Sequence, residues 1–480
     1  MAFRLIETDY LIIGAGACAM AFVDTLLTEK PDVKVVMVDR FHRPGGHWNV
    51  AYPFVRLHQP AAWYGAASLE LGDGTVEKTG PNAGMYGLAS GAEILAHFDN
   101  VMRERFLPSG RVHWLPMSEY ESSTDGQHGI RSLMSGDVIE VAVRRKLVNA
   151  THARTEVPAT HPPKYAVDSG LQCIAVNHLP SIRRPYAAYT VVGSGKTGID
   201  ACLWLLEHGV PPDRIRWVMP RDAWYLDRAN IQPGLENFER NMGYVTNQFD
   251  AIANADTIEQ LFVLLEASGT LVRLNPTVTP TVFRCANVSQ NELALLRTIN
   301  DVVRLGRVQA LMPTRMVLAQ GSVAADPDTL YVDCSSSAIQ RQPKLPVFDG
   351  STVNLFLVRT CQPTFSAAVI AYVESHFSEQ AQQNAVCAVV PPPEYPVDWL
   401  RMWLVTLSNS GHWAQHPGMQ EWLAQCRLNG VAVMMRGVAR DDDVRMTIVK
   451  SNGTKGKMAV PKLQSLLAME ASWQAEQHPH

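Results

Sequence analysis

The chain has 480 residues, of which 46% are hydrophobic and 18% are charged, and its formal net charge at pH 7 is −4. This composition is typical of a folded protein, and the length exceeds the roughly 250–300 residues at which a single core usually divides. No lysine- or arginine-rich block occurs, so neither a nucleic-acid partner nor an anionic membrane surface is indicated.

The N-terminal residues predict a complete βαβ unit. The apolar, partly β-branched run Thr8–Ile13 predicts a buried strand, and helical spacing of apolar residues predicts a helix over Ala17–Thr28. A second strand is expected over Lys34–Val38, directly before Asp39. The stretch Tyr10–Val23, with Arg4 before it, resembles a signal peptide, but its glycines and its continuation into the unit favour folded structure.

A glycine-rich turn joins the first strand to the helix. It reads Gly14-Ala15-Gly16-Ala17-Cys18-Ala19, which fits a dinucleotide-binding fingerprint. In such a fingerprint the first glycine makes the turn, the second lets the backbone approach the pyrophosphate, and the third position, here Ala19, allows close packing. Asp39 is placed to accept hydrogen bonds from the adenosine ribose, and the adjacent Arg40 is included among the predicted cofactor contacts. A mere tight turn is the alternative.

The residues between the first unit and the next one predict a small sheet and two connections. Ser122–Gln127 is expected to be a polar turn, and Val138–Val148 to form two strands. Proline-rich stretches at Pro158–Pro163 and Pro180–Pro185 are expected to lead as hinges into a second nucleotide-binding domain.

The same order of elements then recurs. A strand is predicted over Ala188–Val192, a helix over Thr197–His208 and a strand over Ile215–Met219. The turn between the first two contains Gly193, Gly195 and Gly198 at full fingerprint spacing, and Lys196 and Thr197 are predicted pyrophosphate contacts.

The string Gly195-Lys196-Thr197 also suggests an NTPase phosphate loop. That motif needs a glycine five residues before Gly195, where this chain has Thr190. The turn is therefore interpreted as a second dinucleotide site. Because Arg221 follows the second strand and arginine can pair with a 2′-phosphate, NADPH is favoured over NADH, although Asp222 beside it would favour NADH.

The remaining residues predict a return to the first domain and then an extension. A helix is expected over residues 291–304, strands over 329–334 and 353–358, and a helix over 367–376. Beyond Pro391, amphipathic helices are expected at 398–407 and 418–426, and strands at 431–435 and 445–450. The extension, 391–480, could cap a pocket, form a dimer contact or complete the core.

Two dinucleotide loops in one chain point to a flavin held permanently and a nicotinamide cofactor that reduces it. The predicted fold is α/β, with two Rossmann-like dinucleotide-binding domains and the NAD(P) domain inserted into the FAD domain. The expected boundaries are 1–180 and 325–390 for the two parts of the FAD domain, 186–322 for the NAD(P) domain and 391–480 for the extension.

The cysteines and apolar stretches predict a cytoplasmic protein without a metal site. The eight cysteines form no Cys-x-x-Cys pair and are not spaced with histidines like a zinc site. Scattered cysteines fit a reducing compartment, where they act as small buried apolar groups. No run of about 18 apolar residues occurs, so no membrane span is expected.

One further segment carries a family resemblance. Gly45-Gly46-His47-Trp48, Tyr52-Pro53 and Arg56-Leu57-His58-Gln59-Pro60 resemble the segment after the FAD fingerprint in class B flavoprotein monooxygenases, which include flavin-containing and Baeyer–Villiger monooxygenases. The resemblance implies that Gly46, His47, Trp48, Arg56, His58 and Gln59 line the diphosphate and the isoalloxazine ring. A Gly-Gly turn followed by core aromatic residues is the alternative.

Three later segments extend the resemblance. Val148–His152 is similar to the strand-end Ala-Thr-Gly of two-dinucleotide flavoproteins, and Val332–Ser335, which contains Asp333, resembles the late Asp-Cys-Thr-Gly-type segment beside the flavin. Gln362–Ala368, with Thr364, Phe365 and Ser366, resembles the helix start near the flavin pyrimidine, where a helix N-terminus would stabilise negative charge. A capped surface helix is the alternative there.

The resemblance has a departure that bears on oxygen chemistry. The named subfamilies carry Phe-x-Gly-x-x-x-His before the second fingerprint, whereas this chain reads Cys173-Ile174-Ala175-Val176-Asn177-His178 and keeps only the histidine. His178 is the candidate counterpart, with a structural histidine as the alternative. Arg228 and Asn230 are candidates to face the nicotinamide.

The resemblance implies FAD and NADPH as cofactors and a monooxygenase that inserts one oxygen atom from O₂ into a small organic substrate through a flavin C4a-hydroperoxide. A flavin reductase or dehydrogenase without oxygen insertion and a non-catalytic flavin redox sensor are the alternatives. Residues 40–60 contain no cysteine, which argues against a disulfide reductase. A homodimer is compatible with the sequence, and the substrate is not encoded in any motif.

Overall fold

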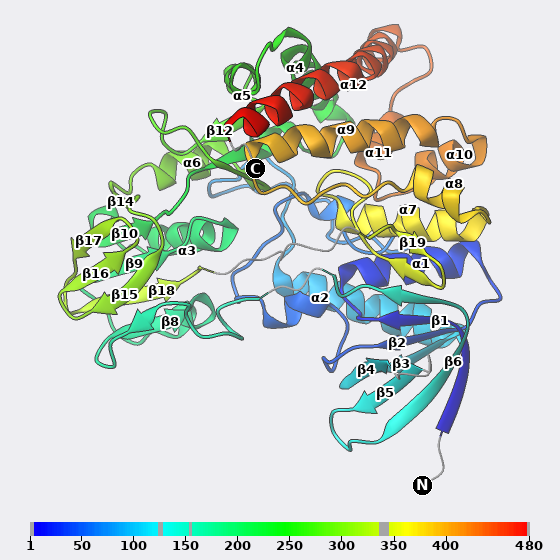
Figure 1. Cartoon of the computed structure of the whole chain (residues 1–480), viewed down its shortest axis with the longest axis horizontal. Coiled ribbons are helices and arrows are strands. Elements are labelled where there is room, and N and C mark those ends of the chain that lie inside the picture. The colour runs from blue at the N-terminus through cyan, green and yellow to red at the C-terminus, as the bar shows by residue number, and fades with distance from the viewer. Residues whose placement is uncertain (1–3, 123–127, 153–155, 336–344, 478–480) are drawn as a thin grey trace.

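The computed structural model describes residues 4–122, 128–152, 156–335 and 345–477, with side-chain burial described as far as residue 470. Two sheets with flanking helices form the two ends of the view in Figure 1, one around β9 and the other around β1. Helices of the C-terminal residues run across the top of that view. The predicted α/β class is confirmed, with parallel strands in each of two units.

The first unit is built on an eight-stranded sheet of order β19-β20-β6-β1-β2-β3, with β4 and β5 extending from β6. Pairing is parallel from β20 through β6, β1 and β2 to β3. Its strands are β1 (Arg4–Ile13), β2 (Val35–Val38), β3 (Val112–Leu115), β4 (Ser118–Ser122), β5 (His128–Ser132), β6 (Val138–Asn149), β19 (Phe348–Asp349) and β20 (Thr352–Asn354).

The second unit is built on a five-stranded parallel sheet of order β14-β10-β9-β18-β8. Two smaller sheets, β12-β11-β13 and β17-β16-β15-β7, adjoin it. The strands are β7 (Ala166–Val167), β8 (Gln172–Ala175), β9 (Ala188–Val192), β10 (Ile215–Val218), β11 (Ala223–Asp227), β12 (Leu271–Arg273), β13 (Val282–Val288), β14 (Asp301–Val303), β15 (Val308–Met312), β16 (Arg315–Leu318), β17 (Gly321–Ala324) and β18 (Thr329–Asp333).

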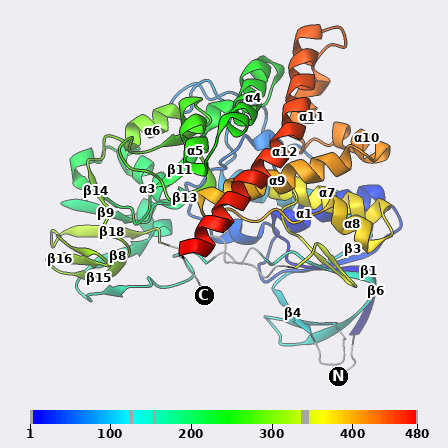
Figure 2. The same ribbon diagram turned by 45° about the horizontal axis from the view of Figure 1, so that its top comes forward.

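The α-helices flank these sheets and cover the top of the molecule (Figure 2). They are α1 (Ala17–Glu29), α2 (Gly91–Asn100), α3 (Lys196–Glu207), α4 (Phe238–Asn254), α5 (Ile258–Ala267), α6 (Gln290–Leu296), α7 (Pro363–His376), α8 (Gln380–Val386), α9 (Pro396–Trp413), α10 (Pro417–Gln425), α11 (Gly430–Arg436) and α12 (Asp443–Gln477).

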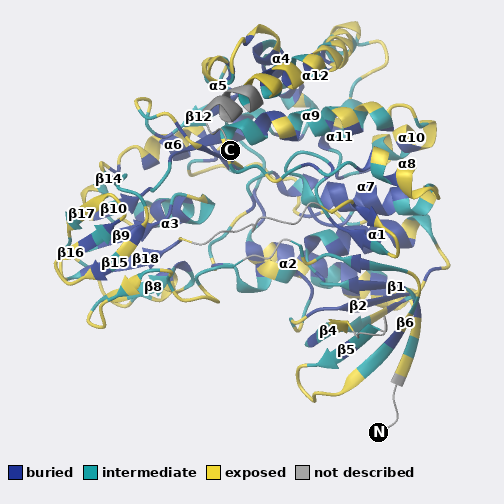
Figure 3. Cartoon of the chain, in the orientation of Figure 1, coloured by how far each residue is buried: buried dark blue, intermediate teal, exposed yellow. Residues whose placement is uncertain are grey.

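Helix α1 is buried on nearly all sides, because it packs between the first sheet and α7. Figure 3 shows α1 and α7 as mostly buried. A helix that is apolar all round is expected only in such a position. Small side chains at Ala17, Ala19 and Ala21 are fully or almost fully buried and permit close packing of the helices.

The C-terminal residues complete the cores of both units. Trp413 and Met419 belong to the buried cluster around α1 and α7. Trp399 and Leu463 belong to a second cluster with α4, α5 and the small sheet. Helix α12 packs along α4 and α9, as Figures 1 and 2 agree. Of the three roles considered for 391–480, completion of the core is therefore the one that the packing shows.

Several predicted elements differ in the structure. Val138–Val148 lies in one strand, β6, because the run contains no turn residue and finds a partner strand on each side. Residues 291–304 divide into α6 and β14. The polar turn expected at Ser122–Gln127 lies outside the described residues apart from Ser122, which ends β4.

The two strands predicted in the extension are wrong. Val431–Met435 lies in α11, where Met434 packs against Phe238 and Met242 of α4. Arg445–Lys450 lies in α12. A short apolar run does not distinguish a strand from a helix, and the surroundings of both segments offer helices to pack on and no sheet edge to join.

The second unit begins earlier and ends later than the expected 186–322. Strand β8 and strand β18 both belong to its parallel sheet, where β18 lies between β9 and β8. Residues 172–175 and 329–333 therefore lie beside the second glycine loop, although the sequence suggested that they belong to the first domain.

The structure also pairs two cysteines that the sequence gives no reason to pair. Cys285 on β13 and Cys361, just before α7, form a disulfide with a sequence separation of 76 residues. The other six cysteines are free.

We predict that alkylation of the denatured, unreduced protein modifies six cysteines. Closing a loop of this length is expected to stabilise the folded chain by about 4 kcal/mol. In Cys285→Ser all seven remaining cysteines should react, because Cys361 loses its partner. Eight modified cysteines in the wild-type protein, counted by mass spectrometry, would contradict the pairing.

Candidate dinucleotide-binding recess

The first glycine loop connects β1 to α1 and leaves the start of the helix uncapped by any side chain. Gly14 has a φ of +94°, which favours glycine, and its N–H donates to the Val38 carbonyl at 2.8 Å. A Cβ on Gly16 would meet only the Gly46 Cα, at 3.7 Å. Because the first-turn N–H groups have no side-chain partner, this end of α1 can receive a phosphate.

The Gly45–Val50 segment lies directly against this loop. The Gly45 N–H donates to the Ala15 carbonyl at 2.8 Å. A Cβ on Gly46 would stand 2.8 Å from the Gly16 Cα, so the two backbones meet at a place that permits no side chain on Gly46. The first glycine loop and the Gly45–Trp48 segment, on which the family resemblance rests, are therefore in contact in the fold.

His47 and Trp48, the next two residues, point to different surroundings. The Trp48 indole is buried and donates to the Tyr64 hydroxyl at 2.9 Å, as a core aromatic residue does. Solvent reaches the His47 ring, yet burial by the surrounding protein lowers its pKa to about 4. His47 is therefore neutral at pH 7.

Asp39 holds the first loop to the end of β2. Its Oδ2 accepts from the Ala15 N–H at 2.6 Å and its Oδ1 from the Phe41 N–H at 2.9 Å. Burial raises the pKa of this carboxyl, against the opposing effect of the two hydrogen bonds. Each carboxylate oxygen keeps a lone pair for another donor. Arg40 beside it is exposed.

The start of α7 lies beside the start of α1. The Cys18 sulfur is 3.8 Å from the Pro363 carbonyl oxygen. Ser366, fully buried, accepts hydrogen bonds from the backbone N–H groups of Val358 and Arg359. Thr364 is also buried, and its hydroxyl has no hydrogen-bond partner in the structure. Phe365 is fully buried in the core. An unpartnered buried hydroxyl is suited to a bound ligand.

Arg359, which the sequence did not single out, stands next to this helix start. Its guanidinium lies 5.7 Å from the centre of the Phe365 ring and 6.0 Å from that of Trp413. Burial lowers the pKa of Arg359 to about 10. Among the described residues no carboxylate lies within ion-pair distance of Arg359. Its positive charge is therefore available beside the start of α7.

The second glycine loop has the same design. Gly193 has a φ of +128°, and a Cβ there would come within 2.5 Å of the Cys334 carbonyl oxygen. A Cβ on Gly198 would collide with the Gly193 carbonyl oxygen, which also accepts a hydrogen bond from the Trp217 indole at 2.8 Å. A Cβ on Gly195 would meet nothing within 4 Å. Space is therefore left at the second glycine, where a pyrophosphate would approach.

The two loops are joined by contacts between Tyr52 of the first unit and helix α3 of the second. The Tyr52 hydroxyl donates to Asp200 Oδ2 at 2.5 Å, and Lys196 forms an ion pair with both carboxylate oxygens of Asp200. Thr197 is half-buried in the same helical turn. Burial, with Lys196 and Arg228 nearby, holds the pKa of His58 well below its usual value.

Arg228 and Asn230 lie near this junction, but their donors are engaged. Arg228 is buried and donates to Glu292 Oε2 at 2.7 Å, to the Asn287 carbonyl at 3.0 Å and to the Asn82 side chain. The Asn230 amide donates to the Gly269 carbonyl at 3.0 Å. Arg228 thus positions the segment between the units.

The other predicted residues lie in several separate places. Arg56 pairs with Glu77 at 2.8 Å, and the Gln59 amide is 3.4 Å from the Trp63 carbonyl. Asp333 ends β18 beside the second loop and accepts from the Ser335 N–H and hydroxyl. His178 is exposed, on the short helical segment Val176–Ser181.

After the end of β10, Asp222 pairs with Arg304 and not with the adjacent Arg221. Arg304 binds Asp222 with two parallel hydrogen bonds, at 2.8 and 3.0 Å. Arg221 is linked to the second loop through Ser194, whose hydroxyl donates to the Arg221 carbonyl at 3.0 Å. The guanidinium of Arg221 pairs with Glu394 at 3.1 Å.

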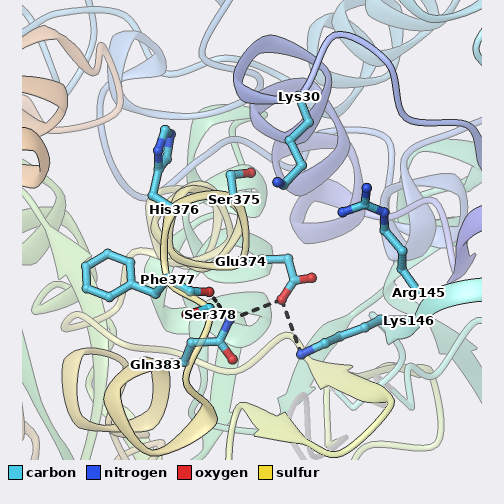
Figure 4. A pocket seen from close by; sticks show the side chains of 9 residues that line it. All are labelled: Lys30, Arg145, Lys146, Glu374, Ser375, His376, Phe377, Ser378 and Gln383. Atoms are coloured by element: carbon cyan, nitrogen blue, oxygen red, sulfur yellow. Dashed lines mark hydrogen bonds and ion pairs between the residues drawn. The ribbon is translucent and has the colours of Figure 1, made fainter.

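A separate pocket of about 360 Å³ lies at the far ends of α1 and α7 (Figure 4). Its lining includes Lys30, Lys146 and Glu374. Glu374 accepts from the Tyr10 hydroxyl at 2.9 Å and pairs with Lys146 at 3.3 Å. The pocket lies about 20 Å from the first glycine loop along α1, so it is separate from that loop.

Reasoning from the sequence missed the partners Asp200, Arg304 and Glu394. The i,i+4 spacing of Lys196 and Asp200 on a helix could have indicated their ion pair. The other two are distant in sequence and carried no signal. Among the described residues no group of metal ligands is found, and none of the described helices is both long and apolar enough to cross a membrane.

No model of a known protein family matches the chain. Over 472 residues the chain is 44% identical to the uncharacterized protein Rv2000 of Mycobacterium tuberculosis, with 97% of this chain and 86% of the relative covered. The uncharacterized protein Mb2023 of Mycobacterium bovis matches with the same figures.

Three solved structures are similar at low identity. The flavin-containing monooxygenase from Stenotrophomonas maltophilia is 15% identical with a TM-score of 0.45, over 76% of this chain and 98% of that one. Closed cyclohexanone monooxygenase is 12% identical with a TM-score of 0.45, over 94% and 98%. OTEMO in complex with FAD and NADP is 13% identical with a TM-score of 0.49, over 77% and 83%.

We predict that Gly195→Ala leaves the protein folded and lowers NADPH affinity by at least about tenfold, which corresponds to about 1.4 kcal/mol. The added methyl meets nothing in the fold but occupies the space that the phosphates need. Gly243→Ala, where a Cβ also meets nothing within 4 Å, is the matched control and should bind NADPH normally. Thermal denaturation and NADPH titration measure the two effects, and unchanged affinity in Gly195→Ala would contradict this use of the loop.

Proposed function

The chain belongs to the same family as the mycobacterial proteins Rv2000 and Mb2023, and we propose that it is an FAD-dependent, NADPH-reduced monooxygenase of small organic substrates. One observation carries the proposal. Two glycine loops, each at a helix start that no side chain caps, are joined through Tyr52 and Asp200, so that each can hold a dinucleotide near this contact.

The residues of the first loop fit FAD. Gly16 leaves room for the pyrophosphate, and Asp39 keeps lone pairs that can accept from the ribose hydroxyls. Thr364 offers a buried hydroxyl without a partner, and the N-terminus of α7 with Arg359 favours negative charge at the pyrimidine end of the flavin. When bound, FAD would supply the hydride and oxygen chemistry.

The second loop fits NADPH. Gly195 leaves room for the pyrophosphate, and Arg221 is the cation for a 2′-phosphate. Arg304 binds both oxygens of Asp222 and balances its charge, so this carboxylate next to Arg221 repels a 2′-phosphate less than an unpaired one would.

The protein's own contribution to the reaction is orientation and control of protons. His47 and His58 are held neutral by burial, so neither adds a positive charge near the glycine loops at pH 7. Tyr52 keeps its proton, because burial and Asp200 raise its pKa well above the usual value. His178 and Asn230 remain candidates for contacts with the nicotinamide, while Arg228 acts by positioning the Tyr52–His58 segment through the His58 carbonyl.

A second candidate function is a flavin reductase or dehydrogenase that does not insert oxygen. The observation that favours it is the absence of the phenylalanine and glycine that precede His178 in the named monooxygenases. The two functions share both cofactors and differ only in the fate of the electrons.

One experiment separates these functions. We expect purified protein to contain FAD, and NADPH to bleach the flavin in the absence of oxygen. With oxygen and a panel of thioethers and ketones, a product with one added oxygen atom supports the monooxygenase. Hydrogen peroxide equal to the NADPH consumed, with no oxygenated product, supports the reductase. Flavin that neither NADPH nor NADH bleaches would overturn both functions.

We predict that Arg221→Gln raises the KM for NADPH by about tenfold and leaves the KM for NADH unchanged. A charge-assisted contact contributes about 1.5–3 kcal/mol, and partial exposure of Arg221 places the effect at the lower end. Arg216→Gln is the control, since Arg216 lies on β10, which leads to Arg221, and pairs with Asp301. An equal effect of Arg221→Gln on both nucleotides would remove its role at the 2′-phosphate.

A further inference from the structure

Glu394, at the start of the C-terminal extension, places one carboxylate oxygen between two arginines of the second unit. Its Oε1 is 3.1 Å from Arg221 Nη2 and 3.2 Å from Arg284 Nη2. The next residue, Tyr395, lies with its ring 5.8 Å from the Arg221 guanidinium. Two cations thus converge on a single acceptor atom beside the second loop.

The backbone of Glu394 is fixed, whereas its side chain is able to turn. The Glu394 carbonyl accepts from the Phe283 N–H at 3.0 Å, and the Glu394 N–H donates to Asp398 at 3.0 Å. The side chain is 32% exposed, so the carboxylate can rotate into solvent without disturbing β13 or α9. Although burial opposes ionisation, the two arginines keep the pKa of Glu394 below its usual value.

The charge at this place is unbalanced. Arg221 and Arg284 carry two positive charges against the one negative charge of Glu394. Two other carboxylates nearby are already engaged: Asp222 pairs with Arg304, and Asp398, which accepts from the Glu394 N–H, pairs with Arg401. A phosphate monoester carries a charge of about −1.5 to −2 at pH 7 and accepts several hydrogen bonds, so it matches two arginines better than one carboxylate does.

We propose that Arg221 and Arg284 form a two-arginine clamp for the 2′-phosphate of NADPH, and that Glu394 is a built-in counterion that the phosphate displaces. The inference rests on the proposed use of NADPH and adds Arg284 and Glu394 as determinants of specificity. NADH has no 2′-phosphate and leaves the carboxylate in place. The C-terminal extension therefore takes part in the choice of nucleotide through one side chain.

The test measures binding of adenosine 2′,5′-bisphosphate and of adenosine 5′-monophosphate to the full-length protein by calorimetry. These probes differ by the 2′-phosphate and need no turnover. Glu394→Gln should bind the bisphosphate about threefold to tenfold more tightly, because the competing charge at a partly exposed site is removed. Arg284→Gln should bind it about tenfold more weakly. Neither variant should change binding of the monophosphate.

The ion pair between Glu266 and Arg273 provides matched controls. This ion pair joins α5 to β12 at 2.6 Å and does not contact Glu394. Strand β12 belongs to the three-stranded sheet that also contains Arg284 on β13. Glu266→Gln and Arg273→Gln should leave the affinity for both probes unchanged. Thermal denaturation confirms that each variant is folded.

Each other outcome overturns a defined part of the inference. Weaker bisphosphate binding in Glu394→Gln would show that Glu394 holds the arginines in place and does not compete. Unchanged binding in Arg284→Gln, with a loss in Arg221→Gln, would remove the clamp and leave the NADPH assignment intact. If Arg221→Gln also fails to distinguish the two probes, the NADPH assignment of the proposed function fails.

Discussion

The hydrogen bond from Tyr52 to Asp200 links the two units that carry the glycine loops. Tyr52 follows the segment that touches the first glycine loop, and Asp200 lies one helical turn beyond the second loop. Both ends of this contact are therefore tied to a loop that can hold a phosphate. Because burial and the negative charge of Asp200 keep Tyr52 protonated, the contact persists across the physiological pH range.

A buried network reinforces this arrangement. Arg228 reaches from the second unit to the His58 carbonyl and the Asn82 side chain, while Glu292 balances its charge. A buried ion pair without additional partners costs free energy, but here nearly all donors of the guanidinium are satisfied. The network explains why an arginine that the sequence suggested for catalysis is found in a structural position.

The C-terminal extension packs against both units. Its tryptophans complete both cores, so the extension cannot move as a separate module without exposing apolar surface. Its first residues nevertheless reach the second unit, where Glu394 contacts Arg221. One segment thus links the packing of the two units to the charge at the predicted phosphate site.

The sequence by itself determined the two βαβ units, because glycine spacing and apolar periodicity are local properties that dictate the local backbone. It also predicted that the backbone approaches a pyrophosphate at Gly16 and Gly195, while the resemblance implied a diphosphate contact at Gly46. The division of 391–480 into helices, the parallel partners of β18 and the Cys285–Cys361 pair depended on neighbours far along the chain. Only the tertiary structure brought Arg304 to Asp222 and Glu394 to Arg221, since such ion pairs form between surfaces that no short sequence pattern encodes.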